Sequence, residues 1–163
     1  MSYFDSDQLG VQDVRSVLKF VQDTTNVRGY DRPVEQGAER PFFVLAPPRG
    51  TPEIFSAGWY RYKPMILGTL FVDEPEQMQE FVSRIATMLM VNCQEIPLIS
   101  VTAEGDWVET EGKLDECEFA NNLVSDDALN FQVIGQRYVS EREVELPSLD
   151  TAVFNKELNT YGT

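Results

Sequence analysis

Hydrophobic and polar positions are patterned most clearly from Trp59 to Met90, where two elements follow one another. Trp59–Val72 predicts one long strand, and its second half, from Met65, is apolar enough for the centre of a sheet. A helix is predicted next, because apolar residues recur at three- and four-residue intervals: Met78, Phe81, Val82, Ile85, Met88 and Leu89. The pair predicts a core in which a helix packs on a sheet.

Polar residues set the expected limits of this helix and of an earlier one. Asp73 is the expected N-cap, with Pro75 in the first turn and Glu76 three residues after the cap. A first helix is predicted from about Val11 to Asp23, with Asp13 away from its apolar face. That face is formed by Val11, Val14, Val17, Leu18 and Val21.

Short apolar runs between glycines and prolines predict the other strands. These are Pro41–Ala46, Ile96–Thr102, Asp106–Thr110, Lys113–Phe119 and a last strand that closes the sheet, Leu129–Val139. Gly105 and Gly112 are expected turns, and Pro47–Pro52 is expected to be an ordered, projecting loop. Pro64 places its strand at an edge or a bulge. The predicted fold is α+β, a mostly antiparallel sheet packed by two amphipathic helices.

The pattern fades near residue 140. Residues 1–139 are expected to form one α+β domain, and residues 140–163 an extended C-terminal arm that orders against another molecule, or a loose tail. The arm contains Pro147 and scattered apolar residues: Leu146, Leu149, Val153, Phe154, Leu158 and Tyr161.

Acidic residues outnumber basic ones, 27 to 13, which gives a net charge of −14. Such a surface repels phosphate, so specific nucleic-acid binding is not expected. Residues 104–127 contain nine acids and one lysine, whereas residues 28–63 contain six bases and four acids. This asymmetry indicates either solvated loops or a head-to-tail contact between the acidic face of one subunit and the basic loop of another.

Catalytic and metal-binding patterns are scarce. The chain has no histidine and no glycine-rich phosphate-binding loop, so no enzyme activity, cofactor or metal site is expected. An enzyme that uses only Lys, Tyr or carboxylate side chains stays an open alternative. Cys93 and Cys117 are expected to be buried free thiols, with a disulfide between them left open. Since no apolar run approaches the ~20 residues of a membrane span and no signal peptide is recognised, we expect a soluble intracellular protein.

Two segments contain residue types that are typical of protein interfaces. Trp59, Tyr60 and Tyr62 alternate with Arg61 and Lys63, and aromatic and arginine side chains are enriched at binding hot spots. Some of these rings are alternatively the core face of a strand. Further interface candidates are Arg49 in the proline-rich loop and Leu149, Phe154 and Tyr161 in the C-terminal arm.

The order of elements from about Val11 to Val139 resembles the tail terminator proteins of long-tailed bacteriophages. The segments that carry the resemblance are Arg40–Ala46, Lys63–Val72 with its following helix, and Leu129–Tyr138. In that family the protein forms a hexameric ring that stops polymerisation of the tail tube and offers a surface to the head-side connector. No catalytic residues are implied.

The resemblance implies a structural virion protein of the tail or neck, assembled in the host cytoplasm. Its expected partners are further copies of itself, the tail tube protein and the head-side connector, with DNA passing through the lumen without specific binding. Two further alternatives to this role stay open. One is another neck, tube or baseplate protein, and the other is an acidic mimic of DNA that inhibits a host nuclease or polymerase.

Overall fold

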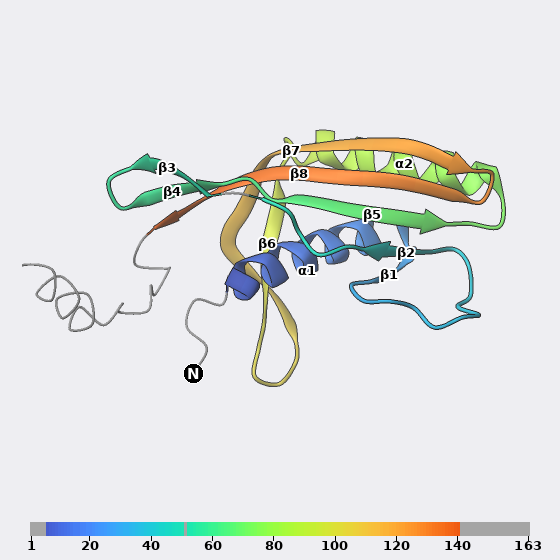
Figure 1. The fold of residues 1–163 in the computed structure, drawn as a ribbon, viewed down its shortest axis with the longest axis horizontal. Coiled ribbons are helices and arrows are strands. Elements are labelled where there is room, and N and C mark those ends of the chain that lie inside the picture. The colour runs from blue at the N-terminus through green and yellow to red at the C-terminus, as the bar shows by residue number, and fades with distance from the viewer. Residues whose placement is uncertain (1–5, 51, 141–163) are drawn as a thin grey trace, which may run out of the picture.

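The computed structural model describes residues 6–50 and 52–140 (Figure 1). Its elements are, in chain order, α1 (Ser6–Thr25), β1 (Arg28–Tyr30), β2 (Phe42–Leu45), β3 (Pro52–Ser56), β4 (Trp59–Tyr62), β5 (Met65–Phe71), α2 (Pro75–Val91), β6 (Ile96–Val101), β7 (Trp107–Ser125) and β8 (Ala128–Ser140). The predicted α+β class, with two helices and a mostly antiparallel sheet, is confirmed. The predicted C-terminal arm from residue 141 onward lies outside the described residues. No helix in the described part of the chain is both long and apolar enough to cross a membrane.

β8 is the central strand of the sheet, although the last strand was expected to close it. β5 and then β4 pair along one edge of β8, and β7 pairs along the other. Tyr62 pairs with Arg137 and Met65 with Ile134, so the register does not change between β4 and β5. The predicted single strand Trp59–Val72 is therefore two strands on one ladder.

The break between β4 and β5 lies at Lys63 and Pro64. Proline has no N–H to donate to a neighbouring strand, which explains why the ladder is interrupted at this point. The N–H of Gly135 on β8 still donates to the carbonyl of Pro64 at 3.2 Å, so the two segments stay aligned. The prediction that Pro64 lies on an edge strand or at a bulge is wrong: β4 and β5 each lie between two neighbouring strands, and the proline interrupts the strand without a shift of register.

The outer strands differ from prediction in two places. The segment that follows the proline-rich loop is a strand, β3, which forms a hairpin with β4 and was not predicted. Gly105 lies in a turn, as expected, with a φ of 90°, but Gly112 lies inside the continuous strand β7. A Cβ on Gly112 would come within 3.1 Å of the Leu98 side chain, so this glycine allows close packing of β6 on β7 and makes no turn.

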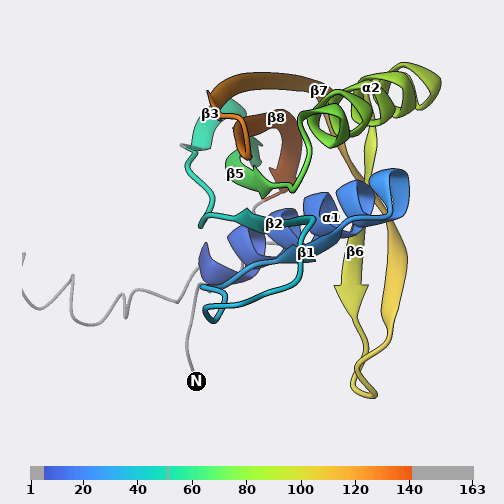
Figure 2. The same ribbon diagram turned by 90° about the vertical axis from the view of Figure 1, so that its right-hand side faces the viewer.

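One face of the sheet packs against both helices, and the sheet curls around them in the end view (Figure 2). Along β5 the buried positions alternate strictly, as Ile66, Gly68 and Leu70. The core combines these with residues of both helices, including Val17, Leu18, Val21, Met78, Phe81, Ile85 and Leu89. Val11 and Met88, which were assigned to the apolar faces, are 40% and 37% exposed because they lie at the margins of those faces.

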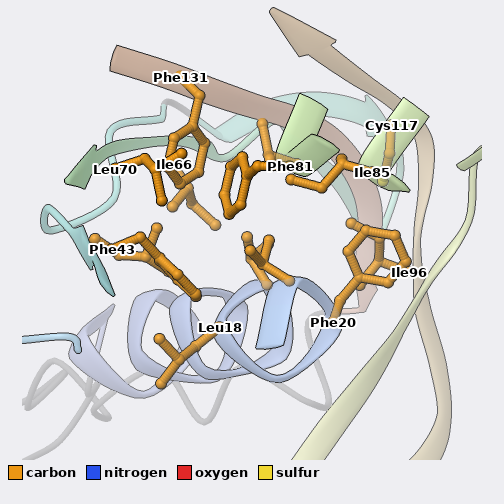
Figure 3. Close-up of a cluster of buried hydrophobic side chains, with 14 of the residues drawn as sticks. Leu18, Phe20, Phe43, Ile66, Leu70, Phe81, Ile85, Ile96, Cys117 and Phe131 are labelled. Carbon is orange, nitrogen blue, oxygen red and sulfur yellow. The ribbon is translucent and has the colours of Figure 1, made fainter. Parts of the chain in front are cut away.

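Aromatic rings from the sheet and α2 meet at the centre of the core (Figure 3). The ring centroids of Phe81 and Phe131 are 5.3 Å apart, and those of Phe43 and Phe131 are 6.1 Å apart. Gly68 lies opposite Phe131 on the neighbouring strand, and a Cβ there would come within 2.3 Å of that ring. A glycine is required at this point because the phenylalanine occupies the space of a side chain.

Three local predictions are corrected. α2 is capped by Glu74 and not by Asp73, because Gln77 folds back so that its Oε1 accepts both backbone N–H groups, at 3.2 and 3.0 Å respectively. Asp13, expected away from the apolar face of α1, is fully buried. Both cysteines are free thiols, but Cys117 is buried and Cys93 is exposed after the end of α2.

Candidate interaction surface

The β3–β4 hairpin and the C-terminal end of β8 form a small sheet that extends from the main body of the protein (Figure 1). We call this unit the hairpin sheet. β4 is its middle strand and pairs with residues 137–140 of β8. β3 is its outer strand, and all five of its residues are exposed. The hairpin sheet therefore presents much of its surface to solvent.

The interface candidates of β4 lie on two opposite faces of the hairpin sheet. Paired residues on antiparallel strands have side chains on the same face. Arg61 pairs with Tyr138, and Trp59 shares their face, which we call the outer face. Tyr60 and Tyr62 pair with the buried residues Val139 and Arg137 on the inner face.

The outer face contains a group of exposed aromatic rings. Phe55 is 59% exposed, Trp59 46% and Tyr138 40%. The rings of Phe55 and Tyr138 are in edge contact, with centroids 4.9 Å apart. Neither Phe55 nor Tyr138 was named as an interface candidate from the sequence. The signal for Phe55, an apolar Ile-Phe pair directly after the proline-rich loop, was present but weak.

Basic side chains lie on the same outer face. The Nη2 atom of Arg61 is 2.5 Å from Glu53 Oε2, and this pairing raises the pKa of the arginine and lowers that of the carboxyl. Lys63 follows two residues later on the same face and contributes to lowering the pKa of Glu53. Glu116 on β7 is close enough to raise the pKa of Arg61.

Arg49 joins this surface through its backbone. Its N–H donates to the carbonyl of Met65 at 2.8 Å, and the N–H of Met65 donates back at 2.5 Å, which places Arg49 on the outer face. A Cβ on Gly50 would meet the carbonyl oxygen of Lys63 at 2.6 Å, so this loop lies directly against the junction of β4 and β5. The basic–aromatic platform is defined as Arg49, Phe55, Trp59, Arg61, Lys63 and Tyr138.

The other bases of residues 28–63 are engaged elsewhere. Arg40 forms an ion pair of 2.9 Å with Asp127 and lies over the ring of Phe71, and Arg28 lies over the ring of Tyr30. Arg32 forms an ion pair of 3.4 Å with its neighbour Asp31. Within the described residues, Arg49 and Lys63 form no ion pair. The basic charge predicted from the sequence is therefore most available at the platform.

The inner face holds the hairpin sheet to α1. Arg137 donates through Nη1 to Gln12 Oε1 at 2.9 Å, and its Nε lies 3.4 Å from Asp13 Oδ1. Burial raises the pKa of Asp13 to about 7, although the charge of Arg137 acts to lower it. Burial also raises the pKa of Tyr62, with a further contribution from Asp13. The half-buried Tyr60 and Tyr62 thus belong to the packed side of the sheet.

A second hairpin, formed by β6 and β7, projects in a different direction, beyond α1 (Figures 1 and 2). We call residues 99–112 the acidic arm. Its turn is closed by the N–H of Thr102, which donates to the carbonyl of Asp106 at 2.9 Å, and by the N–H of Gly105, which donates to that of Thr102. Four exposed acids lie on the arm without a basic residue: Glu104, Asp106, Glu109 and Glu111.

The acidic arm also exposes apolar side chains. Val101 and Trp107 pair across the two strands and are 39% and 38% exposed, and Val108 on the other face is 47% exposed. From the sequence, this segment was predicted as two short strands around a turn at Gly105, and its acids as solvated loops or as an acidic face that contacts another subunit. The exposed side chains of Trp107 and Val108 were not named as interface candidates.

The interface candidates of the C-terminal arm are not part of the described structure. Leu149, Phe154 and Tyr161 lie outside the described residues. Among residues 6–50 and 52–140, no group of three or more His, Cys, Asp or Glu side chains is placed to hold a metal ion.

Comparison with known proteins gives limited similarity. No protein-family model matches the chain, and no curated protein sequence matches it. Among solved structures, the chain is similar to a chain of the virion of a native gene transfer agent (GTA) particle. The two are 12% identical with a TM-score of 0.49, and the match covers 85% of this chain and 99% of the other.

Proposed function

We propose that this protein is a structural virion subunit that forms a ring at the end of a phage tail tube, stops its polymerisation and joins it to the head-side connector. The observation that carries the proposal is the pair of exposed hairpins on one domain, the basic–aromatic platform and the acidic arm. The order of elements, which resembles that of tail terminator proteins, supports the same role and implies six copies in the ring.

The arrangement of the two hairpins favours a ring. They project from the body in different directions (Figure 1), so the arm of a chain does not cover its own platform. A contact between two different surfaces of identical subunits is head-to-tail. Repeated contacts of this kind form a ring when the rotation from each subunit to the next brings the last subunit back to the first. A ring has two end faces, so it can bind a tube on one face and a connector on the other.

The charge of the chain is compatible with a passage for DNA. A net charge of −14 repels phosphate groups, so DNA would pass the lumen without specific binding. This supports the expectation that the partners are proteins: the tube protein, the connector and further copies of the chain.

Light scattering after size-exclusion chromatography tests the ring, and electron microscopy of tail tubes incubated with the protein tests the cap. We expect a closed oligomer, either free in solution or at one end of the tube, and tubes that no longer lengthen. A protein that stays monomeric and does not bind tube ends would contradict the proposal. Binding along the tube wall or at its distal end would favour a tube or baseplate role instead.

A further inference from the structure

We infer that the acidic arm of one copy binds the basic–aromatic platform of the next copy. This inference rests on the proposed self-assembly and specifies its interface. The partner of each surface is thus a second copy of the chain.

Charge supports this pairing. The acidic arm contributes four exposed acids and no base, and none of these acids forms an ion pair within the described residues. The platform contributes three bases, near which lie the acids Glu53 and Glu116. On a chain of net charge −14, such a positive surface is where a second acidic copy meets attraction.

Exposed rings support it as well. The arm presents Trp107 beside Val101, and the platform presents Phe55, Trp59 and Tyr138. Binding energy at protein interfaces is concentrated in aromatic and arginine side chains that become buried, while charges at the rim set orientation and association rate. Both surfaces combine these two features, with the opposite sign of charge.

The local geometry favours a rigid contact. The arm is an antiparallel hairpin whose turn is closed by backbone hydrogen bonds, and the platform lies on paired strands with Arg49 fixed to Met65. Neither surface has to become ordered on binding, which lowers the entropic cost of association.

Zero-length carbodiimide crosslinking tests the contact directly, because it joins a carboxylate to a lysine amine only when they touch. Equal amounts of unlabelled and ¹⁵N-labelled protein are mixed, crosslinked and analysed by mass spectrometry. We expect mixed-label peptides that join Lys63 to an acid of the arm, such as Glu109 or Glu111. An assembled sample whose crosslinks never join the arm to Lys63 would overturn the inference.

Charge reversal provides a second test. Glu109→Lys with Glu111→Lys, or Arg49→Glu with Lys63→Glu, should each weaken self-association by about tenfold or more. The variant that carries all four changes should associate again, since the attraction is restored with its signs exchanged. Glu35→Lys with Glu39→Lys makes the same charge change as the arm variant at exposed loop positions outside both surfaces and should associate like the wild type. Thermal unfolding of each variant confirms that it is folded.

The outcomes separate the inference from the proposed function. If the wild type assembles and both charge-reversed variants assemble equally well, the interface is wrong and the ring stands. If the wild type is monomeric in solution and at tube ends, the ring and the interface both fall.

Discussion

Asp13 on α1 and Arg137 on β8 lie side by side in the interior of the protein, with 3.4 Å between Oδ1 of the aspartate and Nε of the arginine. Asp13 is fully buried and Arg137 is 7% exposed. The pair links the first helix to the strand that carries the hairpin sheet. Neither oxygen of Asp13 accepts a hydrogen bond within the described residues, so its charge is poorly compensated.

This pair predicts a pH dependence of stability. The pKa of Asp13 is raised from 3.8 to about 7, mainly by burial, so the folded protein keeps a proton that the unfolded chain has already released. The resulting stabilisation is fully present below pH 3.8 and is lost as the pH rises to about 7, on the order of 4 kcal/mol in total.

Urea unfolding at about pH 5 and about pH 8 measures this loss, and Asp13→Asn should largely remove it because the amide does not titrate in that range. Asp23→Asn, at an exposed position of the same helix, should keep the wild-type difference. If Asp13→Asn shows the wild-type dependence on pH, another group is responsible.

Gly68→Ala should destabilise the protein by about 2 kcal/mol, because the new methyl group would overlap the ring of Phe131 in a packed core. Thermal or urea unfolding measures the change. Gly112→Ala is the matched control: its methyl group would meet the end of the Leu98 side chain at 3.1 Å, which can move aside. Equal losses in the two variants would contradict the importance of the Phe131 contact.

The two faces of the hairpin sheet should respond differently to substitution. Tyr62→Ala removes a half-buried ring and should lower the free energy of unfolding by about 1–3 kcal/mol. Trp59→Ala removes a ring from the platform and should leave stability within about 1 kcal/mol while weakening self-association about tenfold. Urea unfolding and sedimentation velocity measure the two effects. A Trp59 variant that unfolds easily but associates normally would reverse the assignment of faces.

The two thiols should differ in reactivity. Cys93 is exposed and should react with iodoacetamide in the folded protein. Burial raises the pKa of Cys117 to about 12, and the thiolate is the reactive form, so Cys117 should react only after unfolding. Mass spectrometry with and without urea locates the label, and Cys93→Ser isolates the buried thiol. Rapid labelling of Cys117 in the folded protein would show that the core opens easily.

Periodic segments were predicted well, and segments whose structure depends on distant partners were not. The stripe Met78, Phe81, Ile85 and Leu89 is buried as expected, because a helix places such residues on one side by local geometry. β3 was missed because a short exposed strand after prolines has no pattern of its own and forms by pairing with β4.

The candidate surface was predicted by residue type and resolved only by the fold. Trp59, Arg61 and Lys63 were chosen together with Tyr60 and Tyr62, but strand alternation and the position of α1 place the tyrosines on the packed side. Trp107 was overlooked because its acidic neighbours dominate the local composition. Its exposure follows from the projection of the arm beyond the body of the protein.

By itself, the sequence determined the fold class, the apolar faces of the helices, the apolar character of β5 and the charge difference between residues 28–63 and residues 104–127, since these follow from local periodicity and composition. The tertiary structure alone decided that β8 is central, that Asp13 is buried and that the basic and acidic segments project as separate hairpins. These features depend on which distant segments pair, and pairing is set by the whole packed core.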